Sequence, residues 1–166
     1  ISEWHSHHPV GNAVRVLNGP YWMGRDVARA IVLLPTSTAA RPAGYILDSW
    51  GGMHPFGAAT QPQTSGYWVG RDIARGIALN SDGTSGYVLE GWGGLHPFGG
   101  AVRVSNGPYW YGRDIASAAV SIGTRTAPAG YVLDGFGGVH RFGTAPPVDP
   151  TIYWGYDIAR GLAVAP

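Results

Sequence analysis

Residues 67–99, YWVGRDIARGIALNSDGTSGYVLEGWGGLHPFG, form one copy of a repeat that determines the fold. The Tyr-Trp dipeptide that opens this copy stands at 21, 67, 109 and 153, with separations of 46, 42 and 44 residues. A short segment centred on aspartate follows each dipeptide, and three copies continue with Gly-Tyr, an acid, an aromatic residue, Gly-Gly and His-x-Phe-Gly. Self-similarity at this period is typical of tandem-repeat architectures.

Spacing within the repeat separates rigid parts from variable ones. Nine residues lead from the second tyrosine (45, 87 or 131) to the histidine (54, 96 or 140), and thirteen lead from that histidine to the next Tyr-Trp. The variation in length falls between Tyr-Trp and Gly-Tyr, within 34–43, 80–85 and 123–129. These segments are predicted to be surface loops.

The local pattern favours β-structure. In the second copy, segments 73–79, 87–90, 95–98 and 101–104 predict four short strands, and Gly93-Gly94 suits a two-residue hairpin turn. Four strands in about 42–46 residues are typical of a propeller blade. The alternative is a short helix over 25–34 and its counterparts, although glycines 76 and 161 within the equivalent segments favour a strand.

The two ends of the chain together make a further repeat. Residues 4–16 match the back half at 92–104, whereas 153–166 is only a front half. We therefore predict one all-β domain over 1–166, a four-bladed β-propeller whose last blade is closed by N-terminal strands. Its blades are 21–66, 67–108, 109–152, and 153–166 plus 1–20. Linkers 12–20 and 100–108 are near copies, while 58–66 and 144–152 differ, which predicts an A-B-A-B pattern with pseudo-two-fold symmetry.

This organisation resembles a four-bladed β-propeller of hemopexin-like architecture. The cassette from Gly-Tyr to His-Pro-Phe-Gly is similar to tandem propeller repeats of secreted bacterial proteins, and the resemblance covers essentially the whole chain. It implies a secreted or cell-surface location. The hemopexin family commonly closes its ring with a disulfide, but this chain has no cysteine, so the similarity is one of shape.

Composition disfavours several classes of partner. All eleven basic residues are arginine, ten acids leave a net charge of +1, and no run of one sign is present. We expect no nucleic-acid partner, because such binding relies on clustered positive charge. The longest apolar run, 30–35, is too short to cross a bilayer, so we expect no membrane insertion. No catalytic motif is recognisable, which predicts a protein that is not an enzyme.

The four Tyr-Trp pairs are the candidate ligand-binding residues. An exposed tryptophan face can hold the C–H face of a sugar, and several weak sites on one ring give avidity. The alternative is that these tryptophans, like Trp50, Trp92 and Phe136, pack between neighbouring sheets. The candidate pairs are Tyr21 and Trp22, Tyr67 and Trp68, Tyr109 and Trp110, and Tyr153 and Trp154.

One aspartate per repeat is predicted to lie at one end of the innermost strands. The four are Asp26, Asp72, Asp114 and Asp157. If they converge on the axis, they could hold Ca²⁺ or Mg²⁺ in a central channel. The alternative is hydrogen bonding from a neighbouring blade, or ion pairs with arginines 25, 71 and 113. The repeated histidines are expected to form structural hydrogen bonds at sheet edges.

Together these features predict a non-catalytic binding module, a monomer or small homo-oligomer, with carbohydrate as the leading ligand. A glycan or an extracellular protein would be its partner. The first alternative is a structural or protein-interaction module of a secreted protein that uses loops 34–43 and 123–129. The second is an enzyme or cation site at the channel mouth, built on the four aspartates.

Overall fold

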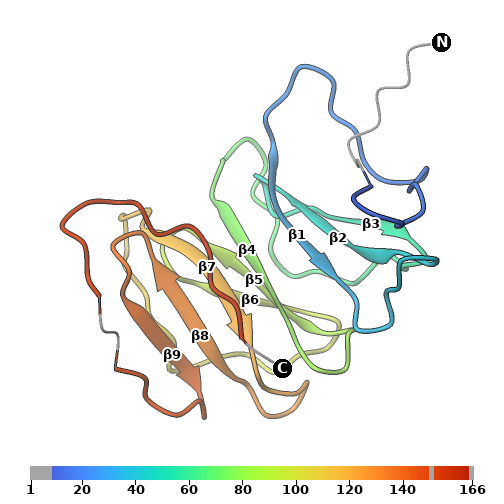
Figure 1. The fold of residues 1–166 in the computed structure, drawn as a ribbon. Helices are drawn as coiled ribbons and strands as arrows, with labels where there is room; N and C mark the ends of the chain where they lie inside the picture. The colour runs from blue at the N-terminus through green and yellow to red at the C-terminus, as the bar shows by residue number, and fades with distance from the viewer. Residues whose placement is uncertain (1–8, 150–151, 165–166) are drawn as a thin grey trace.

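The computed structural model describes residues 9–149 and 152–164, which form three antiparallel sheets of three strands each (Figure 1). Within each sheet the strands lie in chain order. The first sheet contains β1 (Ala28–Leu33), β2 (Ala43–Asp48) and β3 (Met53–Gly57). The second contains β4 (Ala74–Leu79), β5 (Gly86–Glu90) and β6 (Leu95–Phe98), and the third β7 (Ala116–Ser121), β8 (Ala129–Asp134) and β9 (Val139–Gly143).

The all-β prediction is confirmed, and the helical alternative for 25–34 is wrong because β1 occupies that segment. Across the described ranges there is no helix that could cross a membrane. Each repeat has three strands rather than the four predicted. Segment 101–104 is not a strand, because the Val102 amide donates a 2.9 Å hydrogen bond to the carbonyl of Arg125, in a loop of the next repeat.

The hairpin turn between β5 and β6 also differs from the prediction. Its loop has three residues rather than two. The Gly93 amide donates to the Glu90 carbonyl (2.8 Å), and the Glu90 amide donates to the Gly94 carbonyl (2.9 Å). Gly93 has a φ of +94°, the left-handed conformation that closes three-residue hairpins and that glycine adopts most readily. The turn thus holds the carboxylate of Glu90 close to the loop amides.

The three sheets lie side by side, with β1, β4 and β7 along their shared inner side (Figure 1). β4 contacts β1 and β2, and β7 contacts β4 and β5. Because successive strand residues point to opposite faces, β5 contributes to two cores. Its Val88 packs towards the first sheet, whereas Tyr87 and Leu89 pack with Val132 and Phe142 of the third.

The Gly-Tyr dipeptide serves this sheet packing. A β-carbon on Gly86 would lie 2.2 Å from the carbonyl oxygen of Ala78 and 2.9 Å from Cζ of Phe98, so only glycine fits without displacement. The neighbouring Tyr87 is fully buried, and its ring meets the edge of Phe142 with centroids 5.7 Å apart. The loops that were predicted to vary connect the first and second strands of each sheet.

The near-copy linkers 12–20 and 100–108, called the A-type linkers below, make the same contacts. The side chain of Asn18 exchanges two 2.8 Å hydrogen bonds with the backbone of Gly57, and Asn106 does the same with Gly143 at 2.8 and 2.9 Å. In the first linker, the Val14 amide donates to the carbonyl of Ala39. The described N-terminal residues therefore lie against the first sheet.

The C-terminal front half begins a further repeat. The amides of Ile158 and Ala159 both donate 2.8 Å hydrogen bonds to the Gly135 carbonyl, as Ile115 and Ala116 do to Gly91. No fourth sheet is formed in the part of the chain that the structure describes. The strands predicted to complete it begin in residues 1–8, which lie outside the described residues, and 9–20 form no strand with 152–164.

Candidate ligand-binding cleft

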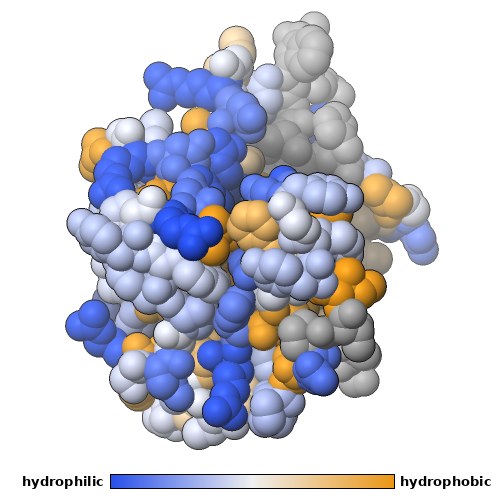
Figure 2. Space-filling model, turned by 90° about the vertical axis from the view of Figure 1, so that its left-hand side faces the viewer, coloured by the Kyte–Doolittle hydropathy of each residue, from blue (hydrophilic) through white to orange (hydrophobic). Residues whose placement is uncertain are grey.

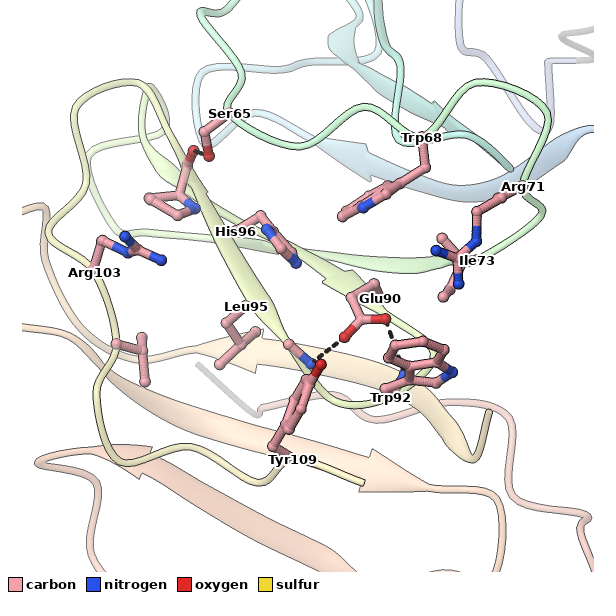
Figure 3. Close-up of a pocket in the computed structure, with 13 residues that line it drawn as sticks. Ser65, Trp68, Arg71, Ile73, Glu90, Trp92, Leu95, His96, Arg103 and Tyr109 are labelled. Atoms are coloured by element: carbon pink, nitrogen blue, oxygen red, sulfur yellow. Dashed lines mark hydrogen bonds between the residues drawn. The ribbon is translucent and has the colours of Figure 1, made fainter. Parts of the chain in front are cut away.

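A cleft of about 500 Å³ opens beside the second sheet (Figure 3). Figure 3 shows Glu90 and His96 in the middle of the cleft, with Trp68 and Tyr109 on opposite sides of them. Trp68 precedes β4, Glu90 ends β5 and His96 lies on β6, so the sheet fixes the backbone positions of the acid and the imidazole. The remaining lining residues are Ser65, Arg71, Ile73, Trp92, Gly94, Leu95, Pro97, Arg103 and Val104.

Glu90 is the buried acid of this cleft, with 4% of its surface exposed. One carboxylate oxygen accepts the Trp92 amide at 3.2 Å, and the other accepts the Gly94 amide at 3.0 Å. Burial raises the pKa of Glu90 above its ordinary value, although these two amides act in the opposite direction. An ionised carboxylate offers about four acceptor positions, so about two remain for a ligand.

The corresponding acids of the other two sheets are closed off. In the first sheet, Oδ1 of Asp48 accepts both turn amides, which leaves Oδ2 in a 2.8 Å hydrogen bond with Nε2 of His54. Asp134 and His140 repeat this pair at 2.8 Å. Histidines 54 and 140 thus make the structural hydrogen bonds that were expected. Because the Glu90 side chain is one methylene longer, each of its carboxylate oxygens accepts one turn amide. Glu90 forms no hydrogen bond with His96 within the described residues.

His96 is therefore left with free ring nitrogens. Neither of them forms a hydrogen bond within residues 9–149 and 152–164, and its ring lies edge-on to Trp68 with centroids 4.6 Å apart. Burial lowers the pKa of His96, and the positive charge of Arg103 acts in the same direction. The ring is consequently neutral at pH 7, with one donor and one acceptor nitrogen.

Aromatic surface and a guanidinium complete the cleft. Cζ of Arg71 lies 5.2 Å from the ring centroid of Trp92, a cation–π contact. Trp92 also contacts Tyr111 from the next repeat, with ring centroids 5.1 Å apart. Tyr109 is 57% exposed, so its ring can be reached from solvent.

The predicted Tyr-Trp residues take two different positions. Their tyrosines are exposed, and their tryptophans are half-buried. Trp22, Trp68 and Trp110 each meet the edge of their own repeat's histidine, with centroids 4.6–4.9 Å apart. The structure brings together Trp68 and Tyr109, which belong to successive Tyr-Trp pairs, and the other candidate residues do not line this cleft.

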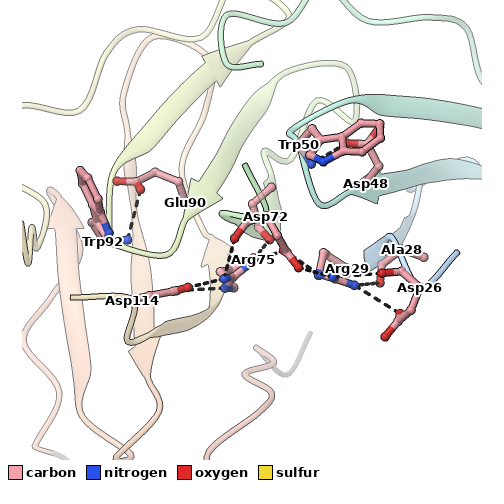
Figure 4. Close-up of polar contacts among 11 residues, drawn as sticks. Asp26, Ala28, Arg29, Asp48, Trp50, Asp72, Arg75, Glu90, Trp92 and Asp114 are labelled. Atoms are coloured by element: carbon pink, nitrogen blue, oxygen red, sulfur yellow. Dashed lines mark hydrogen bonds and ion pairs between the residues drawn. The ribbon is translucent and has the colours of Figure 1, made fainter. Parts of the chain in front are cut away.

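Three of the four aspartates, Asp26, Asp72 and Asp114, alternate with Arg29 and Arg75 in a charge chain (Figure 4). Asp157 lies outside this chain, because Ser117 stands at the position of Arg29 and Arg75, and Asp157 pairs with Arg160 instead. Nε of Arg29 donates to Asp72 of the next repeat at 3.0 Å, and Nε of Arg75 donates to Asp114 at 3.0 Å. Each arginine also bonds the aspartate three residues before it, Asp26 at 3.3 Å or Asp72 at 3.0 Å. Asp72 and Asp114 thus accept hydrogen bonds from the preceding repeat.

The arginine partners were predicted wrongly. The aspartates pair with arginines 29, 75 and 160 rather than with 25, 71 and 113. Hydrogen bonding to Arg29 lowers the pKa of Asp72, and that bond raises the pKa of Arg29. The described residues contain no cluster of three or more potential metal ligands.

Sequence reasoning missed Glu90, His96, Trp92, Arg71 and Arg103 as members of one cleft. One signal was present, because Glu90 is the only glutamate at a position where the other copies have aspartate.

The face in Figure 2 is mostly hydrophilic or of intermediate hydropathy, with hydrophobic residues in small separate groups. That face therefore offers no broad apolar surface for a protein partner.

The loops named for a protein partner also have internal roles. Ala39, in loop 34–43, and Arg125, in loop 123–129, accept hydrogen bonds from the two A-type linkers.

Comparison of the chain with protein-family models, with curated proteins and with solved structures finds no match in any of the three.

Proposed function

We propose that this chain is a non-catalytic carbohydrate-binding module whose ligand occupies the cleft of the second sheet. The observation that carries the proposal is a buried carboxylate, Glu90, beside an imidazole with free ring nitrogens, His96, between the aromatic rings of Trp68 and Tyr109. Sugars present hydroxyl groups to such acceptors and donors, and their C–H faces stack on aromatic rings.

The dimensions support a small ligand. A volume of about 500 Å³ lies within the range of about 300–1,000 Å³ that is common for small-molecule sites. Ligand sites place a few convergent polar groups among aromatic and apolar walls, and this cleft has that composition. A glycan is thus the proposed partner, and secretion or display at the cell surface, where glycans are abundant, belongs to the same proposal.

The test is a glycan array of the purified chain, run with Ca²⁺ and with chelator, followed by titration of tryptophan fluorescence. Tyr109→Ala should weaken binding at least tenfold, whereas Tyr21→Ala, at the same position of the first repeat and outside the cleft, should leave it unchanged. A blank array with folded protein would overturn the proposal, as would equal losses in the two variants. Binding that requires Ca²⁺ would overturn recognition by this cleft alone, because the described residues contain no cluster of three or more potential metal ligands.

We also propose that the three sheets belong to a closed four-bladed propeller. A cavity of about 390 Å³ is lined by side chains from all four repeats, among them Arg29, Arg75, Ser117 and Arg160. The face of β1 remains open, because Ile31 is 61% exposed while its counterpart Ile77, covered by the first sheet, is 8% exposed.

Closure of the ring would bring Arg160 to Asp26, as Arg29 reaches Asp72 of the next repeat. The side chain of Asp26 is 99% exposed, and within the described residues Arg160 forms a salt bridge with Asp157 of its own repeat. Arg160→Glu should destabilise a closed ring, and adding Asp26→Arg should restore stability. Additive effects of the two substitutions would show that the ends do not meet.

A further inference from the structure

Two guanidinium groups of the cleft take no part in the charge chain. Arg71 lies over Trp92, and Arg103 follows β6 in the linker 100–108. Figure 3 shows them at opposite ends of the cleft. Neither forms a salt bridge anywhere in the described ranges.

The charges facing the cleft leave it positive. Arg71 and Arg103 contribute two positive charges, Glu90 contributes one negative charge, and His96 is neutral at pH 7. Asp114 lies close enough to influence Glu90, but its carboxylate is bound by Arg75. The formal charge of the lining is therefore +1, and the unpaired positive charge at the linker end belongs to Arg103.

Arg103 has a counterpart, Arg15, in the near-copy linker 12–20, but none beside the first and third sheets. The linkers that follow the first and third repeats, 58–66 and 144–152, contain no arginine. Glu90 likewise replaces the aspartates that pair with histidine in those repeats. Among the three sheets, the second alone combines a glutamate at this position with a linker arginine, and neither side chain is needed by the sheet packing described above. Their coincidence indicates a single specialised site.

We propose, on the basis of the carbohydrate-binding function above, that this cleft selects sugars that carry an anionic substituent, a carboxylate or a sulfate. Arg103 binds the anionic group, because guanidinium donors match its oxygens and no carboxylate of the described residues forms a salt bridge with it. Tyr109 and Trp68 provide stacking surface for the sugar ring, and Glu90 accepts hydrogen bonds from its hydroxyl groups. Arg71 contributes positive charge while its cation–π contact holds Trp92.

Matched sugars test this selectivity. Methyl glucuronide is compared with methyl glucoside, and a 6-sulfated galactoside with the unmodified galactoside, by calorimetric or fluorescence titration. Each anionic sugar that is bound should bind about tenfold tighter than its neutral match, because hydrogen bonds to charged groups exceed neutral ones. The two pairs show whether carboxylate or sulfate is the preferred group. The preference should shrink as salt is raised, since Arg103 is exposed.

Arg103→Gln should abolish the preference while binding of the neutral sugars persists. Arg15→Gln, at the equivalent position of the other A-type linker, is the matched control and should keep the preference. Equal binding of the anionic and neutral sugars overturns the selectivity but leaves the carbohydrate-binding function standing. Failure of every sugar to bind overturns that function as well. A preference that survives Arg103→Gln overturns the role given to Arg103.

Discussion

Phe142 tests whether the second and third sheets stabilise one another. Its side chain on β9 is fully buried in the cluster between these sheets, with its ring 5.7 Å from that of Tyr87 at an interplanar angle of 70°. Phe142→Ala removes the buried ring and leaves a cavity, which costs about 3–5 kcal/mol in unfolding free energy. The lost aromatic contact accounts for about 0.5–1.5 kcal/mol of this cost.

Urea unfolding, followed by tryptophan fluorescence and circular dichroism, measures the effect. With a slope of about 2 kcal/mol per molar urea, the midpoint should fall by about 1.5–2.5 M. Because β7 packs against β4 and β5, loss of the ring should weaken the packed sheets together, and the two signals should give the same midpoint. Val69→Ala is the control, since this side chain is 79% exposed and its truncation should change little.

A midpoint shift below about 0.5 M would refute the reasoning, because it would mean that the ring is not held between two sheets. A double-mutant cycle isolates the pair contribution. Tyr87→Leu and Phe142→Leu keep much of the apolar burial, so both variants should remain folded. Their coupling energy should be about 0.5–1.5 kcal/mol. A coupling of zero would contradict an aromatic contact between the sheets.

Three further substitutions probe the acid, the loop and the glycine. Glu90→Asp should recreate the acid–histidine hydrogen bond of the other two sheets, which should raise the stability of the protein and the pKa of His96 and weaken sugar binding. An NMR titration in which the pKa of His96 does not change would contradict this. Hydrogen bonds lower the pKa of Asp82 to about 2, although burial acts in the opposite direction. The ionised carboxylate therefore adds on the order of 1 kcal/mol to the free energy of unfolding above about pH 4, and this contribution is lost as pH falls towards 2. Asp82→Asn should therefore flatten the decline of the urea midpoint over that interval, and an unchanged slope would exclude this role. Gly86→Ala should cost about 1–3 kcal/mol by overpacking, measured by thermal unfolding, whereas Gly155→Ala, with open space around it, should be neutral; equal melting temperatures would refute the close contact.

The strands could be predicted from the sequence because their signals are local. Segments 73–79, 87–90 and 95–98 became β4, β5 and β6 with boundaries within one residue. Segment 101–104 has a similar apolar pattern, but a hydrogen bond from Val102 to Arg125 determines its path. The partner lies 23 residues away, so no local pattern could identify it.

The charge chain shows the same limit. The prediction placed an arginine beside three of the aspartates, and the first two repeats each offer two candidates, such as Arg71 and Arg75 around Asp72. The strand direction decides between them. Arg75 reaches Asp72 and, across the sheets, Asp114, while Arg71 turns towards Trp92. This choice depends on how neighbouring sheets are placed, which composition and spacing do not specify.

Glu90 departs from the structural role that its position has in the other two sheets. Asp48 and Asp134 accept the turn amides with one oxygen and bond Nε2 of the histidine with the other. Glu90 lacks the hydrogen bond to histidine. Burial raises the pKa of its carboxyl group, so ionised Glu90 lowers the stability of the folded state at pH values above its unfolded pKa. A departure that costs stability, next to a linker arginine that the other two clefts lack, is typical of a site kept open for a ligand.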